Sequence, residues 1–210
     1  VAQALVAAAA LIAVAVAAPR LGQDDAVTIS IVGTNDLHGH LVPDGRRGGL
    51  EVFAGYVSNL RRARARDHGA VVLVDAGDLL HGTLESNLNE GATVIEAYNA
   101  LGYAAAAVGN HDFDFGPVGP SATPVSIADD PRGALKARAR QASFPFLAAN
   151  MIDAATGRPV DWPNIRPSAS IHVAGVTVGI VGVVTKSALS QTTALNTRGL
   201  RIAPLAVDCR

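Results

Sequence analysis

The chain of 210 residues is 49% hydrophobic and 17% charged, and its formal net charge at pH 7 is -1. These values exclude an intrinsically disordered chain and leave room for one full core, or for one domain and part of another. The nearly balanced charge gives no sign of a protein that binds nucleic acid or another polyanion, and a single cysteine excludes an internal disulfide.

The first part of the chain has the layout of a secretory signal peptide. Residues 1–18 carry no charge and consist mostly of Ala and Val, small residues recur at Ala13, Ala15 and Ala17, and a polar stretch follows. We therefore expect residues 1–18 to direct export to the periplasm or the extracellular space, and residues 19–27 to form a linker. An uncleaved membrane anchor and a buried core helix are the alternatives, and membrane contact is expected only if the segment is not cleaved.

From residue 27 onward, apolar runs alternate with segments of helical periodicity. β-Branched residues predict a strand at residues 27–33, and apolar residues at helical spacing predict a helix at residues 49–67. The continuous apolar run at residues 71–74 suits a strand that is buried on both faces. A second helix is expected at residues 92–101 and a third strand at residues 104–108.

The second half of the chain continues with more irregular spacing. Pro and Gly are frequent at residues 116–131, which predicts a surface insertion. A helix at residues 134–141 and a strand at residues 146–149 follow, and residues 170–173 and 176–184 predict a β-hairpin. This order of strands and helices predicts an α/β layered domain whose central sheet is largely parallel.

Polar side chains follow each of the first three predicted strands. Asp36 and His38 follow the first strand, Asp78 follows the second, and Asn110 and His111 follow the third. Ligands of open α/β sheets bind beyond the carboxyl ends of the strands, and the carboxyl ends of parallel strands lie side by side. We therefore expect these five side chains to meet in space.

The residue types in this set suit divalent metal ions. Asp36 and His38 are two residues apart, so in extended backbone they point to the same side and can hold one ion. The carboxylate of Asp78 can bridge two ions, and Asn110 offers an amide oxygen to the second. Two ions about 3.5–4 Å apart can orient a phosphoryl group, generate hydroxide and stabilise the attacking and leaving oxygens. Mixed Asp, Asn and His ligation suits Zn, Mn, Fe or Co.

Each motif alone has a simpler interpretation, in which Asp-x-His is a capped turn and the histidine forms an ordinary hydrogen bond. The occurrence of all three motifs in order, each at the end of a strand, favours a metal site.

As a set, these motifs resemble the calcineurin-type metallophosphoesterase superfamily, and within it the exported 5′-nucleotidase and 2′,3′-cyclic phosphodiesterase family. The resemblance extends over about residues 28–200 and implies a layered metallophosphoesterase-type sandwich. Residues 28–210 would then be the N-terminal part of the catalytic domain. The motifs that carry the resemblance are Asn35-Asp36-Leu37-His38-Gly39, Gly48-Gly49-Leu50, Asp75-Ala76-Gly77-Asp78, Asn99-Ala100-Leu101-Gly102-Tyr103, Gly109-Asn110-His111-Asp112-Phe113-Asp114-Phe115-Gly116 and Ala149-Asn150.

The resemblance also implies a role for each matching residue. Asp36 and His38 would bind the first metal, Asp78 would bridge the two metals, and Asn110 would bind the second. His111 would be the catalytic histidine that contacts the phosphate and helps the leaving oxygen depart. Asp114 would orient this histidine, because a paired carboxylate selects the tautomer and favours the imidazolium. A surface Asp in a loop is the alternative for Asp114.

The chain departs from the family pattern after Val184, where the family has further histidine ligands and this chain has none. We therefore expect that the sequence is truncated near Arg210, that the C-terminal part of the catalytic domain and the substrate-specificity domain are absent, and that this form binds metal weakly and has little activity. Two spare histidines, His40 and His81, lie near the predicted site and are candidates for contact with substrate or metal. Two others, at positions 68 and 172, are expected to be structural or exposed.

The function that the resemblance implies is an exported two-metal phosphoester hydrolase, a 5′-nucleotidase that releases phosphate from nucleoside monophosphates. A 2′,3′-cyclic-nucleotide phosphodiesterase or a related sulfur-ester hydrolase is the alternative within the same fold. An exported, non-catalytic module that holds metal or phosphate is the alternative of another class.

Overall fold

The computed structural model describes residues 26–205. The predicted signal peptide and most of the predicted linker lie outside this range. Within it, no helix combines the length and the apolar character that crossing a membrane requires.

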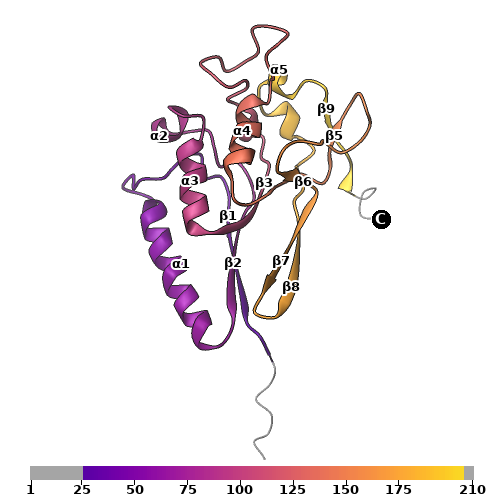
Figure 1. The fold of residues 1–210 in the computed structure, drawn as a ribbon. Helices are drawn as coiled ribbons and strands as arrows, with labels where there is room; N and C mark the ends of the chain where they lie inside the picture. Colours follow the sequence, from indigo (N-terminus) through magenta and orange to yellow (C-terminus); the bar gives the residue numbers. More distant parts are fainter. Residues whose placement is uncertain (1–25, 206–210) are drawn as a thin grey trace, which may run out of the picture.

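The centre of the fold is a sheet of five parallel strands in the order β1-β2-β3-β4-β6 (Figure 1). This confirms the predicted α/β fold with a parallel sheet. The register pairs Thr34 with Asp75 and Asp75 with Ala106, so the first three strands end side by side. The strands are β1 (Ile29–Thr34), β2 (Ala70–Asp75), β3 (Tyr103–Ala107), β4 (Phe146–Leu147) and β6 (Ile165–Arg166).

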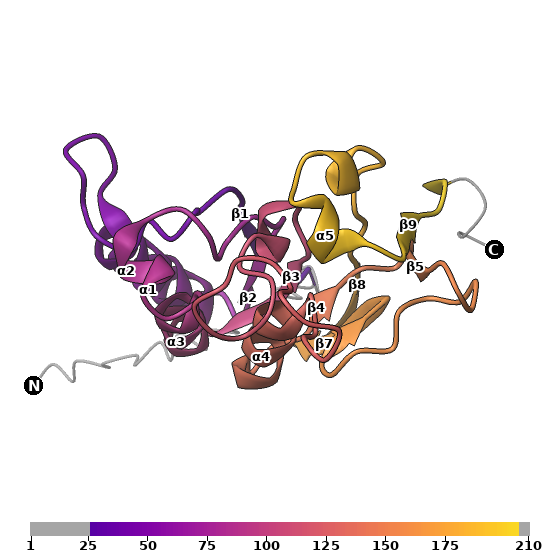
Figure 2. The same cartoon turned by 90° about the horizontal axis from the view of Figure 1, so that it is seen from above.

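Three helices cover one face of the sheet (Figure 2). Burial of their apolar side chains holds them in place. Val57, Ile95 and Leu135, one from each helix, are buried in a common core with Leu73 and Phe146 of the sheet. The helices agree with the sequence prediction within one or two residues. They are α1 (Gly49–Arg66), α3 (Ala92–Leu101) and α4 (Gly133–Gln141).

The predicted hairpin is formed by β7 (Ser168–Val173) and β8 (Val176–Val181), which pair antiparallel apart from the central sheet. Its two turn residues, Ala174 and Gly175, both have positive φ, as tight hairpin turns require. The second strand ends earlier than predicted. Beyond it the backbone leaves the hairpin, because Gly182 accepts a hydrogen bond from Ala149 and Val184 donates one to Asn150. The predicted strand at residues 146–149 also ends early, at Leu147.

Several short elements were not predicted from the sequence. None has more than four residues, so none shows a sequence periodicity from which it could have been predicted. The predicted insertion at residues 116–131 contains no helix or strand, in agreement with its composition. The short elements are α2 (Leu84–Asn87), η1 (His111–Phe113), β5 (Met151–Asp153), η2 (Ala188–Ser190), α5 (Ala194–Thr197) and β9 (Leu200–Ile202), and β5 pairs antiparallel with β9.

Candidate metal centre

The loops that follow β1 and β2 run side by side beyond the ends of the strands. The amide of Asp36 donates to the carbonyl of Gly77 at 3.0 Å, and the amide of His38 donates to the carbonyl of Asp78 at 3.0 Å. These bonds continue the pairing of the sheet into the loops. They satisfy the backbone groups of both loops and bring Asp36, His38 and Asp78 to one place.

An extended backbone was assumed for Asp36 and His38 from their spacing in the sequence. The structure shows instead that the backbone of this region is not extended. Asp36, His38 and Asp78 have φ values of 50°, 49° and 59°, which lie in the left-handed region that Asp and His adopt only occasionally. The two side chains are nevertheless close to each other, with Nε2 of His38 3.7 Å from Oδ1 of Asp36. Three left-handed residues at adjacent strand ends are a local strain of the kind that gathers at functional sites.

Residues from all three loops converge beyond the strand ends. His38, Asp78 and His111 each offer one ligand atom, and these atoms lie within 4.8 Å of one another. The rings of His38 and His111 meet edge to face, with centroids 5.1 Å apart. The amide of His111 donates to Oδ1 of Asp78 at 2.7 Å, so the third loop is tied directly to the second.

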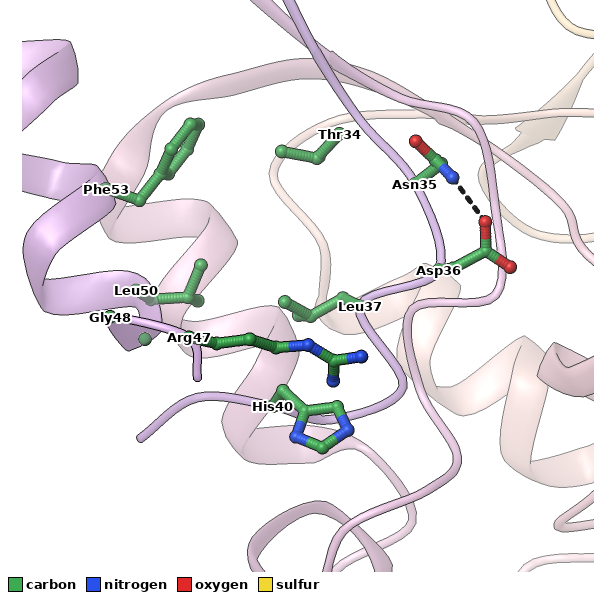
Figure 3. Close-up of a pocket in the computed structure, with 10 residues that line it drawn as sticks. Thr34, Asn35, Asp36, Leu37, His40, Arg47, Gly48, Leu50 and Phe53 are labelled. Carbon is green, nitrogen blue, oxygen red and sulfur yellow. Dashed lines mark hydrogen bonds between the residues drawn. The ribbon is translucent and has the colours of Figure 1, made fainter. Parts of the chain in front are cut away.

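Asp36 and Asn110 are the two remaining residues of the predicted set. The carboxylate of Asp36 is turned towards the side-chain amide of Asn35, which donates a hydrogen bond to it (Figure 3). Asn110 lines a small cavity together with Asp78, and its Nδ2 donates to the carbonyl of Gln191 at 2.9 Å. Asp36 is therefore linked to the group through His38, and Asn110 through the cavity it shares with Asp78.

The hydrogen bonds of His38 and Asn110 leave free the atoms through which these side chains could bind a metal. Nδ1 of His38 lies 2.9 Å from the carbonyl oxygen of His81. A carbonyl only accepts, so Nδ1 donates in this contact and Nε2 is the ring nitrogen left for a metal. Donation of the second ring N–H to a carbonyl is the usual arrangement of a metal-bound histidine. Asn110 donates through its nitrogen and likewise keeps Oδ1 as a ligand oxygen. The donor set fits a divalent ion.

His111 is paired with Asp114, at a distance of 2.6 Å between Nδ1 and Oδ2. The other oxygen of Asp114 accepts a hydrogen bond of 2.6 Å from the hydroxyl of Thr192. The hydrogen bond to Asp114 raises the pKa of His111, and partial burial of the ring opposes this effect. The pair is therefore oriented from both sides, and it leaves Nε2 of His111 free.

Of the spare histidines, His81 is the one that contacts this group. Its Nδ1 lies 3.5 Å from Oδ2 of Asp114, and its ring packs edge to face against Phe115. His40 instead lines a groove beside α1 with Arg47 (Figure 3). The other two, His68 and His172, are exposed, as expected.

Two buried carboxyl groups behind the site were not singled out from the sequence. Asp75 accepts hydrogen bonds from the hydroxyl groups of Thr34 (2.6 Å) and Tyr98 (2.8 Å) and from the amide of Gly77 (2.8 Å), and burial raises its pKa. Burial likewise raises the pKa of Asp112 to about 7, against the effect of the amides that donate to it. For Asp75, its place at the end of an apolar strand was the available signal, and for Asp112 it was the polar run Asn110-His111-Asp112 after the third strand. Thr192 and Gln191 had none, because they arrive on a loop far along the chain.

Comparison with known proteins places this arrangement in a family. A family model described as Calcineurin-like phosphoesterase matches residues 29–160. The chain belongs to the calcineurin-like phosphoesterase family. The predicted resemblance is thereby confirmed at the level of the family.

Proteins similar in sequence to this calcineurin-like phosphoesterase chain, and a solved structure similar to it, carry related names. Protein UshA of Salmonella pullorum is 31% identical over 164 residues, which are 78% of this chain and 26% of that protein. A 5′-nucleotidase of Diplobatis ommata is 31% identical over 172 residues, covering 79% of this chain and 27% of that protein. The crystal structure of a 5′-nucleotidase precursor from Thermus thermophilus superposes with a TM-score of 0.64 and 27% identity, over 86% of this chain and 32% of that one. The chain thus spans about a quarter of the length of these two curated relatives.

Proposed function

We propose that the polypeptide containing this chain is an exported, metal-dependent phosphoester hydrolase of 5′-nucleotidase type. The observation that carries the proposal is the hydrogen-bonded pair His111–Asp114 directly beside His38 and Asp78, where the first three strands end. Family membership and the names of the relatives, UshA and 5′-nucleotidase, support the same reaction class.

The proposed ligands divide between two divalent ions. Asp36 and His38 hold the first ion, Asp78 is shared, and Asn110 holds the second, with Zn, Mn, Fe or Co as candidate metals. Oxygen and imidazole donors with free lone pairs support this assignment. The second ion has two ligands among the described residues, so we propose that its remaining ligands come from polypeptide beyond Arg210. The 210-residue chain alone should then bind metal weakly.

The proposed chemistry of the chain itself rests on His111. Its Nδ1 is held by Asp114, so Nε2 is the atom that faces a substrate oxygen. The raised pKa of the imidazole favours the cation, which stabilises the negative charge that develops on the phosphoryl group and can donate a proton to the leaving oxygen. Bound divalent ions would supply Lewis-acid polarisation of the phosphoryl oxygens and an activated water.

The proposed organisation assigns residues 28–210 to the N-terminal part of the catalytic domain and residues 1–18 to an export signal. Substrate selection is assigned to a further domain of the same polypeptide, in accord with the short share of the relatives that this chain covers. The proposed substrate is a nucleoside monophosphate.

An assay of the full natural polypeptide tests the proposed reaction. AMP, a 2′,3′-cyclic nucleotide and a sulfur ester are compared after removal of metals with a chelator and after return of Zn²⁺ or Mn²⁺. We expect phosphate release from AMP that depends on the returned metal. Inactivity on all three substrates with metal present would overturn the proposal.

A pair of substitutions separates the two kinds of residue in the site. His111→Ala should lower turnover by about 10²–10⁴-fold and leave the bound metal nearly unchanged, because a general acid is lost and no ligand is removed. His38→Ala, the matched control from the facing ring, should lower the metal content. If His111→Ala also loses its metal, His111 is a ligand and its assigned role is wrong.

A further inference from the structure

A fully buried carboxylate lies behind the candidate metal centre, and the hydrogen bonds that it accepts within residues 26–205 come from backbone amides. Asp112 is 1% exposed and follows His111 directly in the chain. No lysine or arginine forms an ion pair with it in residues 26–205. A buried carboxylate without a cationic partner is costly unless hydrogen bonds compensate for the lost water.

The compensation comes from backbone amides of two different loops. Oδ1 of Asp112 accepts from the amides of Leu79 at 3.1 Å and Leu80 at 3.2 Å. Oδ2 accepts from the amides of Gly109 at 2.8 Å and Asp78 at 3.3 Å. One carboxylate thus joins the loop that carries Asp78 to the loop that carries Asn110 and His111.

The same two loops are tied a second time in the opposite direction. The amide of Asp78 donates to Asp112, while the carboxylate of Asp78 accepts from the amide of His111. The space between the loops is tight, since a Cβ on Gly109 would lie 2.1 Å from Oδ1 of Asp78. Asp78, whose backbone is left-handed, is thus held at both its amide and its carboxylate by the loop that carries Asp112.

We propose that Asp112 is a positioning residue that holds the Asp78 loop and the Asn110–His111 loop in the geometry that binds metal, before any ion arrives. This inference rests on the metal site of the proposed function and adds a residue to which no role has been assigned. Partners that orient metal ligands typically change affinity for the metal by about 10–100-fold when they are replaced.

The substitution Asp112→Asn tests this role with little change in shape. Either orientation of the new amide turns an NH₂ group towards two backbone N–H groups, which repel it. In the full natural polypeptide, we expect Mn²⁺ affinity, measured from free Mn²⁺ by electron paramagnetic resonance, to fall about 10–100-fold.

The matched control is Asn164→Ala, which loses partly buried hydrogen bonds away from the site. Nδ2 of Asn164 donates to the carbonyls of Ala139, Ala142 and Phe144, where α4 ends. This variant should unfold at lower temperature and keep the wild-type affinity for Mn²⁺. A loss of affinity in Asp112→Asn that Asn164→Ala reproduces at equal loss of stability would overturn the inference.

Hydrogen exchange in the wild-type protein gives an answer even if Asp112→Asn does not fold. The amides of Asp78, Leu79, Leu80 and Gly109 should exchange slowly without metal, and addition of Mn²⁺ should change them little. Protection that appears only with Mn²⁺ would mean that the ion, and not Asp112, orders the loops. If the wild type binds no Mn²⁺, the proposed function fails and this inference with it, whereas equal binding by wild type and Asp112→Asn overturns the inference alone.

Discussion

At the scale of single residues, the position of Asp114 explains why this carboxylate orients His111 and not the neighbouring His81. The carboxylate contacts Nδ1 of His111 at 2.6 Å and Nδ1 of His81 only at 3.5 Å. The shorter contact is a charge-assisted hydrogen bond that selects one tautomer and one ring orientation. Thr192 holds the carboxylate from behind, so the pair does not depend on a bound ligand for its alignment.

The pairing of His111 with Asp114 predicts how the protonation of His111 and its contribution to stability depend on pH. The hydrogen bond to Asp114 raises the folded-state pKa of His111 above its ordinary value of 6.5. The protonated ring therefore stabilises the fold below the unfolded-state pKa, and this contribution is lost as the pH rises through the folded-state pKa. Asp114→Asn should lower the pKa of His111 measured by NMR in the metal-free protein.

Thr192→Val is the control for that titration. It removes the second hydrogen bond to Asp114 and leaves the carboxylate beside the imidazole. This variant should keep most of the raised pKa of His111. An unchanged pKa in Asp114→Asn would show that the carboxylate is not its cause.

At the scale of elements, the helices and strands that could be predicted from the sequence are those that are long or have a periodic pattern of apolar residues. The helices and the first three strands follow from runs of apolar residues, and the strand-end rule identified Asp36, His38 and Asp78 because it requires only a parallel sheet. The left-handed backbone of those residues did not follow from that rule, because it is imposed by hydrogen bonds to the neighbouring loop. Similarly, β5 acquires strand structure only through β9, which lies far along the chain.

Asn150 shows how such distant elements are joined. It is 1% exposed, and its Oδ1 accepts from the amide of Val184 at 2.8 Å. Its Nδ2 donates to the carbonyls of Val184 at 2.9 Å and Ala203 at 3.3 Å. One side chain thus connects the chain before β5 to the segments that follow β8 and β9.

Asn150→Ala should therefore lower the free energy of unfolding by about 2–4 kcal/mol, because it leaves buried backbone groups without partners. Chemical denaturation measures this value. Asn59→Ala, on the exposed side of α1, should change it by less than about 0.5 kcal/mol. Similar values for the two variants would show that Asn150 does not join these segments.

At the scale of the whole molecule, the two faces of the sheet differ. The helices cover one face (Figures 1 and 2). On the other face Ile31, which alternates along β1 with the core-facing Val32, is 65% exposed. Near the hairpin, that second face forms a groove lined by apolar residues, among them Val74, Ala105, Ala107 and Val181. Parallel sheets are almost always covered on both faces, so an apolar surface of this kind tends to attract a partner.

This second face, exposed at Ile31 in the described part of the chain, should affect the behaviour of the 210-residue chain in solution. We expect this chain to bind a fluorescent apolar dye and to self-associate, as measured by sedimentation. Ile31→Lys should reduce both effects, because it places a charge on an exposed apolar face and on β1, an edge strand of the central sheet. Its free energy of unfolding should change by less than about 0.5 kcal/mol, since the side chain is mostly in water.

The control is Ile127→Lys, which charges a fully exposed apolar residue in the insertion, away from the sheet. Equal effects of the two substitutions would mean that general surface hydrophobicity, and not the open face of the sheet, causes the association.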